Sequence, residues 1–185
     1  MGNKPKLIIF EGAPGAGKST ITRMFREKMK NTSLISESSI PNASPLMSFT
    51  YHFNLYDMIY RMGKVNASFI LDRCHLSQKV YCDLNHVDFN FNEETEVLNE
   101  KINSLCDLYD VYMILLCANA SEYEERLKRD KAQYIKHSVD ESRKQQTTYM
   151  KVFAELGTKA NVIVFNNAGL KPEQTFNLLK AQIGE

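Results

Sequence analysis

Residues 12–19 of this chain read GAPGAGKS, a glycine-rich stretch that ends in a lysine and a hydroxyl residue. An apolar run, residues 7–10, precedes it, and a segment with helical spacing, residues 20–30, follows it. The stretch fits the pattern G-x-x-x-x-G-K-[ST] at every position, in the strand–loop–helix context that the pattern requires. In such a loop the backbone N–H groups surround phosphate oxygens at the positive end of the following helix. The sequence therefore predicts a strand–helix unit that binds a nucleoside triphosphate.

The side chains of this loop have separate expected roles. Lys18 is expected to neutralise charge on the β- and γ-phosphates, and the Ser19 hydroxyl is expected to ligate Mg²⁺. We predict that ATP binds along the loop and the residue after it, which comprise Gly12, Ala13, Pro14, Gly15, Ala16, Gly17, Lys18, Ser19 and Thr20.

The size and composition are those of one ordinary globular domain. The chain has 185 residues, of which 43% are hydrophobic and 24% are charged, and its net charge is +1. We therefore expect a single domain over residues 1–185. Its small net charge gives no overall positive potential of the kind that binds long nucleic acid. The longest apolar runs are too short to span a bilayer, and the first residues do not resemble a signal peptide. We expect a cytoplasmic protein with no membrane association, in which the four scattered cysteines, without a C-x-x-C pair, are reduced and mostly buried.

Apolar runs with strand character alternate with longer segments of helical period. Runs of Ile, Leu, Val and Phe between helices are typical of parallel strands that are covered on both faces. The expected architecture is an α/β, three-layer α/β/α sandwich of the P-loop type with a five-stranded parallel sheet. The expected strands are residues 6–11, 33–37, 67–72, 110–117 and 162–165, and the expected helices are residues 17–30, 45–62, 76–85, 93–108, 121–131, 141–156 and 172–183.

Ligands of open parallel sheets gather at the carboxyl ends of the strands, so the residues after each strand are the first candidates for chemistry. Asp72 closes the third expected strand, where P-loop proteins place a carboxylate that orients Mg²⁺; a helix cap is the alternative. Arg73 beside it has a planar fork suited to a phosphate, with a surface ion pair as the alternative. Glu37 ends the second strand and could accept the proton of an attacking hydroxyl or hydrogen-bond a sugar, although a plain turn residue fits almost as well.

Arg126 and Arg129 are three residues apart on an expected helix, so they share one face. A solvated surface is the ordinary interpretation of such charges. Their place between the fourth strand and the next helix favours a mobile lid, at about residues 126–140, that brings an arginine to the transferring phosphoryl group. On the acceptor side, His75 and Tyr81 follow Asp72 closely enough to line the same pocket.

Three groups of these residues resemble the thymidylate kinase and deoxynucleoside kinase superfamily. They are Phe10-Glu11-Gly12, the phosphate loop with Lys18-Ser19-Thr20, and Asp72-Arg73-Cys-His-Leu-Ser77 followed by Val80-Tyr81. The resemblance implies a nucleotide-kinase fold with a helical lid. It also implies transfer of the γ-phosphoryl group from ATP, with Mg²⁺, to a small deoxynucleoside monophosphate or deoxynucleoside. Dimers are common in these families, so a homodimer is compatible with the sequence, which does not itself define the oligomeric state.

The resemblance also implies roles for individual residues. Lys18 and Ser19 would hold the donor and the metal, and Asp72 would act with Mg²⁺ or the acceptor. Arg73 would contact the acceptor phosphate or the reacting centre. Arg126 and Arg129 would belong to the lid, and Asn167, after the fifth strand, would lie near the adenine.

The chain also departs from the thymidylate kinase pattern. Pro14 stands where those enzymes usually have an acidic residue, the turn after the second strand lacks their acceptor-binding arginine, and Cys74 replaces an aromatic residue. The acceptor therefore stays open. A hydroxyl of a nucleic acid, at a 5′ end or on a modified base in DNA, is the second hypothesis. A nucleotide-dependent switch or NTPase is the third, although the guanine-reading Asn-Lys-x-Asp pattern is missing after the fourth strand.

Overall fold

Five parallel strands form one sheet in the order β2-β3-β1-β4-β5. The computed structural model describes residues 4–36, 44–129 and 138–184. Every strand and helix expected from the sequence is present, with ends that differ by a few residues at most. The elements are β1 (Lys6–Glu11), α1 (Lys18–Lys28), β2 (Thr32–Ser36), α2 (Pro45–Gly63), β3 (Ser68–Asp72), α3 (His75–Asp83), α4 (Asn92–Leu105), β4 (Asp110–Cys117), α5 (Ala120–Arg129), α6 (Val139–Ala154), β5 (Asn161–Asn166) and α7 (Pro172–Gln182).

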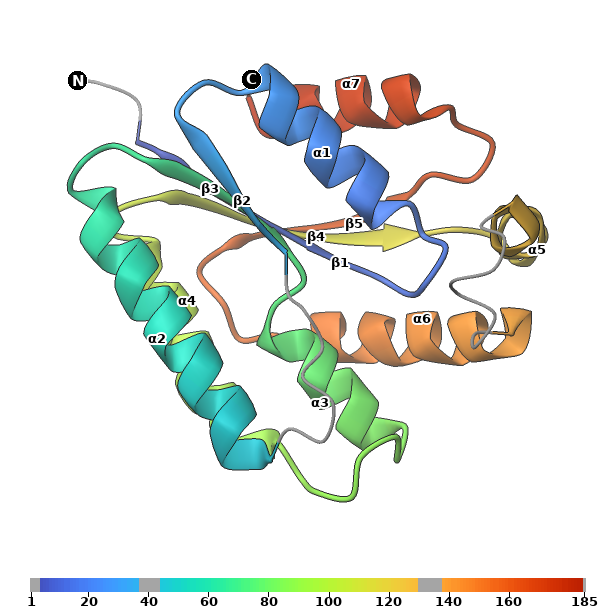
Figure 1. Ribbon diagram of the computed structural model, residues 1–185, viewed down its shortest axis with the longest axis horizontal. Helices are drawn as coiled ribbons and strands as arrows, with labels where there is room; N and C mark the ends of the chain where they lie inside the picture. Colours follow the sequence, from blue (N-terminus) through green and yellow to red (C-terminus); the bar gives the residue numbers. More distant parts are fainter. Residues whose placement is uncertain (1–3, 37–43, 130–137, 185) are drawn as a thin grey trace.

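The central strand β1 is buried along its whole length and serves two cores. Successive side chains of a strand point to opposite faces of the sheet. Leu7 and Ile9 therefore pack with residues of α2, α3, α4 and α6, whereas Ile8 and Phe10 pack with residues of α1 and α7. Figure 1 shows these two helical layers on opposite faces of the sheet. The result is the expected α/β/α sandwich.

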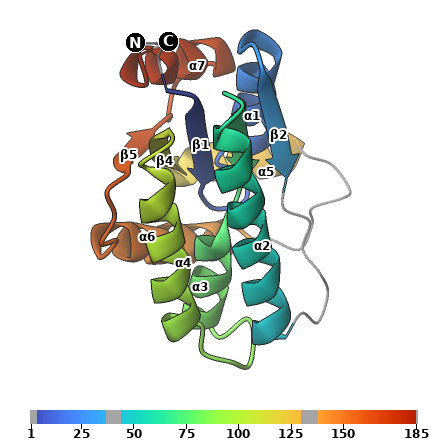
Figure 2. The ribbon, with the colours of Figure 1, turned by 90° about the vertical axis from the view of Figure 1, so that its left-hand side faces the viewer.

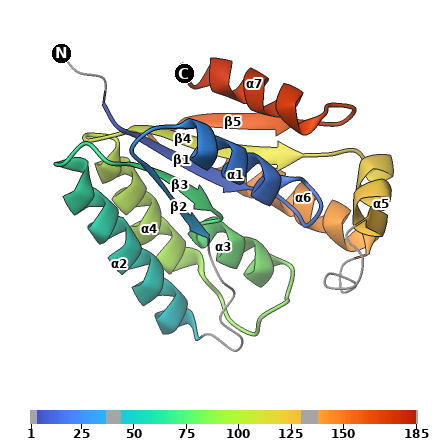
Figure 3. The ribbon, with the colours of Figure 1, turned by 45° about the horizontal axis from the view of Figure 1, so that its top comes forward.

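The register of β1 brings the ends of three strands to one edge of the sheet. Phe10 lies opposite Asp72 of β3 on one side and opposite Ile114 of β4 on the other. Because all the strands are parallel, the segments that follow β1, β3 and β4 leave the sheet at this same edge. Figure 3 shows α5 beyond the end of β4 and the loop between β1 and α1 beside it. The sequence-predicted site residues in these segments are thereby collected on one side of the molecule.

A buried polar cluster joins α2, α3 and α4, which run side by side in Figure 2. The Tyr56 hydroxyl lies 2.7 Å from Nδ1 of His75, and Nε2 of His75 lies 3.0 Å from Oδ1 of Asn99. Burial, followed by the charge of His52, lowers the pKa of His75 to about 3, so this ring is neutral at ordinary pH. His75 was expected to line the acceptor pocket, and that interpretation is wrong because its ring is fully buried between helices.

None of the helices in the described ranges combines the length and the apolar character needed to cross a membrane.

The close approach of the phosphate loop to β4 predicts a stability cost at Gly12. Its φ is +145°, and an added Cβ would lie 2.4 Å from the carbonyl oxygen of Leu116. Because that oxygen belongs to a central strand and the backbone conformation excludes L side chains, we expect Gly12→Ala to lower the free energy of unfolding by about 2 kcal/mol or more. Urea unfolding measures this change.

Gly157→Ala is the matched control, because an added Cβ there would meet nothing within 4 Å. We expect it to change the free energy of unfolding by less than about 0.5 kcal/mol. Equal losses in the two variants would contradict the proposed clash.

Candidate nucleotide-binding site

The loop between β1 and α1 leaves the start of α1 available to an anion. Gly12, Gly15 and Gly17 all have positive φ, which lets the loop turn tightly. No side chain caps α1 at Gly17, whereas Ser44 caps α2 and Ser138 caps α6. The first N–H groups of a helix need a partner, and a phosphate is the natural one at an uncapped N-terminus. The geometry therefore fits the phosphate loop predicted from the sequence.

Lys18 lies inside this loop, with 7% of its surface exposed. Its Nζ donates to the carbonyl oxygens of Gly12, at 2.6 Å, and Ala13, at 3.2 Å. Burial, followed by the positive charge of Arg73, lowers the pKa of Lys18 to about 7. The amine is thus held where an incoming phosphate would favour its charged form.

Ser19 and Asp72 come together at the end of β3. The Ser19 hydroxyl donates to Oδ2 of Asp72 at 3.0 Å, and the carboxylate is largely buried. A hydroxyl and a carboxylate are hard oxygen ligands of the kind that Mg²⁺ prefers, and Mg²⁺ keeps waters and phosphate oxygens as its other ligands. Within the described ranges no group of three or more His, Cys, Asp or Glu side chains could hold a metal by itself. The pair therefore fits a magnesium ion shared with a bound nucleotide.

The turn after β3 is tied to the end of β1. Arg73 has a φ of +81°, which is costly for a residue with a Cβ. Its N–H donates to the Phe10 carbonyl at 2.9 Å, and the N–H of Cys74 donates to Oε1 of Glu11 at 2.7 Å. These two bonds stabilise the strained turn and fix the direction in which the Arg73 side chain leaves the sheet.

The Arg73 guanidinium is held by two hydroxyl groups. Its Nη1 donates to Ser77 Oγ at 3.0 Å and to the Tyr149 hydroxyl at 2.9 Å. Ser77 Oγ in turn donates to Oε2 of Glu11 at 2.8 Å and lies 2.8 Å from the Tyr149 hydroxyl. Burial, followed by the charge of Glu11, raises the pKa of Tyr149 well above its usual value, so the hydroxyl stays protonated.

The sequence analysis missed Tyr149 and assigned no role to Glu11. A signal for Tyr149 was present, because Ser142, Gln145 and Tyr149 follow the spacing i, i+3, i+7 and form one face of α6. All three are buried, and neither Ser142 Oγ nor Gln145 Oε1 has a hydrogen-bond partner within residues 4–36, 44–129 and 138–184. Polar residues that repeat along one buried face of a helix indicate that this face packs against other polar groups.

Arg126 lies on the donor side of the site, against the phosphate loop. Its Nη1 donates to Oδ1 of Asn167 at 3.0 Å and to the carbonyl oxygens of Gly15 and Ala16 at 3.3 and 3.4 Å. An ion pair to Glu122, at 3.0 Å, holds the same guanidinium. Asn167 itself is buried and donates to the Ala16 carbonyl at 2.8 Å. The second half of α5 and the residue that follows β5 are thus joined to the outer side of the loop.

The structure describes the remaining predicted site residues only in part. Thr20 is exposed on α1. Arg129 ends α5, and its side chain lies outside the described part of the structure. Glu37 and residues 130–137 of the expected lid also lie outside the described residues.

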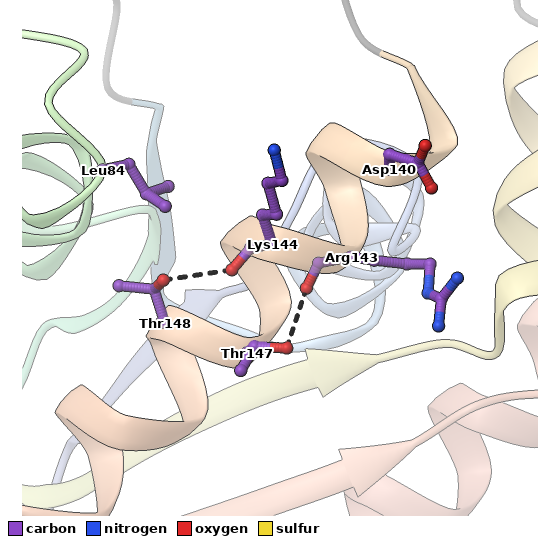
Figure 4. A pocket seen from close by; sticks show the side chains of 6 residues that line it. All are labelled: Leu84, Asp140, Arg143, Lys144, Thr147 and Thr148. Carbon is purple, nitrogen blue, oxygen red and sulfur yellow. Dashed lines mark hydrogen bonds between the residues drawn. The ribbon is translucent and has the colours of Figure 1, made fainter.

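A pocket of about 450 Å³ lies on the outer side of α6, away from these residues. Figure 4 shows Thr147 and Thr148 bonded back to the helix carbonyls of Arg143 and Lys144, with both basic side chains directed outward. None of its lining residues is a sequence-predicted site residue; they are Leu84, Asp140, Arg143, Lys144, Thr147 and Thr148. The pocket is therefore separate from the nucleotide-binding site.

The lowered pKa of Lys18 predicts a pH-dependent stability. Between about pH 7 and the usual value of 10.5, the unfolded chain binds a proton at Lys18 that the folded protein does not. Stability rises with pH wherever the unfolded state binds more protons. We therefore expect the free energy of unfolding of the wild type, relative to Lys18→Met, to increase from about pH 7 to about pH 9.5.

Urea unfolding of both proteins across this range measures the difference. The contributions of the other titrating groups to the free energy of unfolding cancel in it, because both proteins have those groups. A difference that is constant with pH would show that Lys18 is fully charged in the folded protein.

Comparisons with known proteins agree with this geometry. A sequence model of the Zeta toxin family matches residues 1–40, which include β1, the phosphate loop and α1. None of the curated protein sequences compared with the chain matches it.

Solved structures match nearly the whole chain at low sequence identity. YorR from Bacillus subtilis, in complex with phosphorylated GDP, has a TM-score of 0.72 at 18% identity, over 96% of this chain and 95% of that chain. Thymidylate kinase from Candida albicans has a TM-score of 0.68 at 18% identity, over 99% and 92%. Deoxyadenosine kinase from M. mycoides, with bound dATP, has a TM-score of 0.60 at 19% identity, over 97% and 100%. The fold class expected from the sequence is confirmed, and the chain has the fold of the P-loop nucleotide kinases.

Proposed function

We propose that this protein transfers the γ-phosphoryl group of ATP to a deoxynucleoside monophosphate or a deoxynucleoside. The similarity to a thymidylate kinase and a deoxyadenosine kinase supports this class of acceptor. Catalysis of this kind depends on positioning and on neutralising charge, and it needs no covalent intermediate with the protein.

The observation that carries the proposal is that the phosphate loop and the turn after β3 meet, since the Ser19 hydroxyl donates to Oδ2 of Asp72 at 3.0 Å. Lys18 belongs to the phosphate loop and Arg73 to the turn after β3, yet the charge of Arg73 lowers the pKa of Lys18. Two like charges that act on each other raise the free energy of the site, and a bound anion would offset that cost. A phosphoryl group in transfer from donor to acceptor has the charge and the position to do so.

On the donor side, the uncapped start of α1 and Lys18 would bind the phosphates of ATP. Ser19 and Asp72 would hold Mg²⁺, which when bound neutralises charge on the β- and γ-phosphates. Arg126 and Asn167, beside the outer side of the loop, would lie near the adenine.

On the acceptor side, Arg73 would contact the acceptor phosphate. Its Nη1 is occupied by Ser77 and Tyr149, whereas Nε and Nη2 have no hydrogen-bond partner among the residues that the structure describes. These two nitrogens form one edge of the guanidinium fork, which suits a pair of phosphate oxygens. The near-neutral net charge of +1 also favours a small acceptor over a long nucleic acid.

We place this reaction in the cytoplasm. None of the four cysteines, all of which lie in the described ranges, forms a disulfide. Reduced thiols are typical of proteins in that compartment.

An acceptor panel tests the proposal directly. The protein is incubated with ATP labelled in the γ-phosphate and with nucleosides, nucleoside monophosphates or oligonucleotides, and the labelled products are separated. We expect a deoxynucleoside monophosphate or deoxynucleoside to be labelled, and the oligonucleotides to carry much less label. Label mainly in oligonucleotides, with turnover that falls steeply with salt, would favour a nucleic-acid acceptor. Release of phosphate without any labelled acceptor would favour an NTPase or switch.

Lys18→Ala is expected to lower the rate of transfer by at least about a hundredfold while the protein remains folded, because it removes the charge that faces the transferring group. The rate with the best acceptor and the circular dichroism spectrum measure the two effects. Lys151→Ala, at an exposed position of α6, is the matched control and should keep wild-type turnover. Normal turnover in the Lys18→Ala protein would overturn the proposed function.

A further inference from the structure

We propose that Tyr149 is a positioning residue, whose hydroxyl, together with Ser77 and Glu11, fixes the Arg73 guanidinium toward the phosphoryl acceptor. This inference rests on the proposed function, because it gives Arg73 its role toward the acceptor. The four side chains come from β1, from the turn after β3, from α3 and from α6. In the sequence, Tyr149 lies 76 positions after Arg73.

The direction of every hydrogen bond in this cluster follows from proton counting. The ionised carboxylate of Glu11 only accepts, so the single hydroxyl proton of Ser77 is donated to it. Ser77 Oγ then has two lone pairs, which accept from Arg73 Nη1 and from the Tyr149 hydroxyl. Because Tyr149 donates to Ser77, its own oxygen accepts from the other proton of Nη1. Each of these four protons, two on Arg73 Nη1 and one on each hydroxyl, has one acceptor.

This arrangement leaves the guanidinium little freedom to rotate. Both Nη1 protons are bonded to hydroxyl oxygens that are themselves held in place, since Ser77 is bonded to a buried carboxylate and Tyr149 is fully buried. Turning the guanidinium plane would break both bonds at once. The edge formed by Nε and Nη2 is therefore presented in one direction, and a bidentate contact with an anion needs such a fixed plane.

The position of Tyr149 is in turn fixed by contacts of α6 with the sheet. The Gln146 carboxamide accepts from the Ala118 N–H at 2.9 Å and donates to the Ala118 carbonyl at 3.2 Å. Its oxygen also accepts from the Tyr123 hydroxyl at 2.6 Å. These bonds anchor α6 to the end of β4 less than one turn before Tyr149. The hydroxyl that holds Arg73 therefore belongs to a rigid part of the fold.

Steady-state kinetics test the effect on the reaction. We expect Tyr149→Phe to lower kcat/KM for the acceptor about tenfold, as the loss of one buried hydrogen bond to a charged group does, with KM for ATP changed less than about twofold. In an Arg73→Ala background the same change should cost less than about twofold, because the group that Tyr149 positions is gone. Ser77→Ala should act in the same direction as Tyr149→Phe and serves as a second variant.

Tyr109→Phe is the matched control, because Tyr109 is equally buried and its hydroxyl donates to the Ile59 carbonyl at 2.7 Å, in the core away from the site. It should lower stability without changing either kinetic constant. An equal loss of kcat/KM in Tyr109→Phe, or a full tenfold loss in the Arg73→Ala background, would overturn the positioning role.

Nuclear magnetic resonance of the guanidinium groups tests the same inference without any substrate. Slow rotation should give Arg73 separate Nη proton signals in the wild type, identified by their loss in Arg73→Lys, and these signals should merge in Tyr149→Phe. Identical Arg73 signals in the wild type and Tyr149→Phe would overturn the positioning role even in an active enzyme. If instead no acceptor is phosphorylated by the wild type, the proposed function fails, and the signals still decide whether Tyr149 holds Arg73.

Discussion

The pairing of β1 with β3 is the interaction on which the rest of the site depends. Their register sets Phe10 opposite Asp72, so the phosphate loop and the acceptor-side turn begin at the same level of the sheet. A backbone bond from Arg73 to Phe10 and the contact of Ser19 with Asp72 continue this pairing beyond the strand ends. The two halves of the site therefore take their positions from buried backbone hydrogen bonds, which are far more rigid than long surface side chains.

Glu11 connects the paired strands β1 and β3 to the side chains of the site. Its carboxylate is fully buried at the end of β1, and a buried charge is tolerated only when it is paired and hydrogen-bonded. The Cys74 N–H and the Ser77 hydroxyl supply the hydrogen bonds, and the charges of Lys18 and Arg73 supply the pairing. One carboxylate thus stabilises a strained turn, orients a hydroxyl and balances two cations. A residue with fewer acceptors could not do all three.

Local patterns were sufficient to predict the strands, the helices and the glycine-rich loop after β1, because each depends on residues close together in the chain. The period of apolar residues indicated every element, and the glycine-rich motif indicated the loop in which Lys18 is buried. The side-chain partners depended on packing between distant elements. Helical spacing placed Arg126 on a defined face of α5 but could not indicate that this face meets the phosphate loop and Asn167. Proximity to Asp72 in sequence suggested a pocket role for His75, whereas packing of three helices buried its ring.

The charges of the site also bear on how the loop between β1 and α1 would respond to an anion. Without a ligand, Lys18 donates to two loop carbonyls, and its pKa is near neutrality because burial and Arg73 both disfavour its charge. A phosphate close to Nζ reverses that balance, so anion binding near neutral pH also binds a proton. Its negative charge would also offset the repulsion between Lys18 and Arg73. In the proposed reaction, binding energy from the donor phosphates would thereby restore full charge on Lys18 at the place where charge develops during phosphoryl transfer.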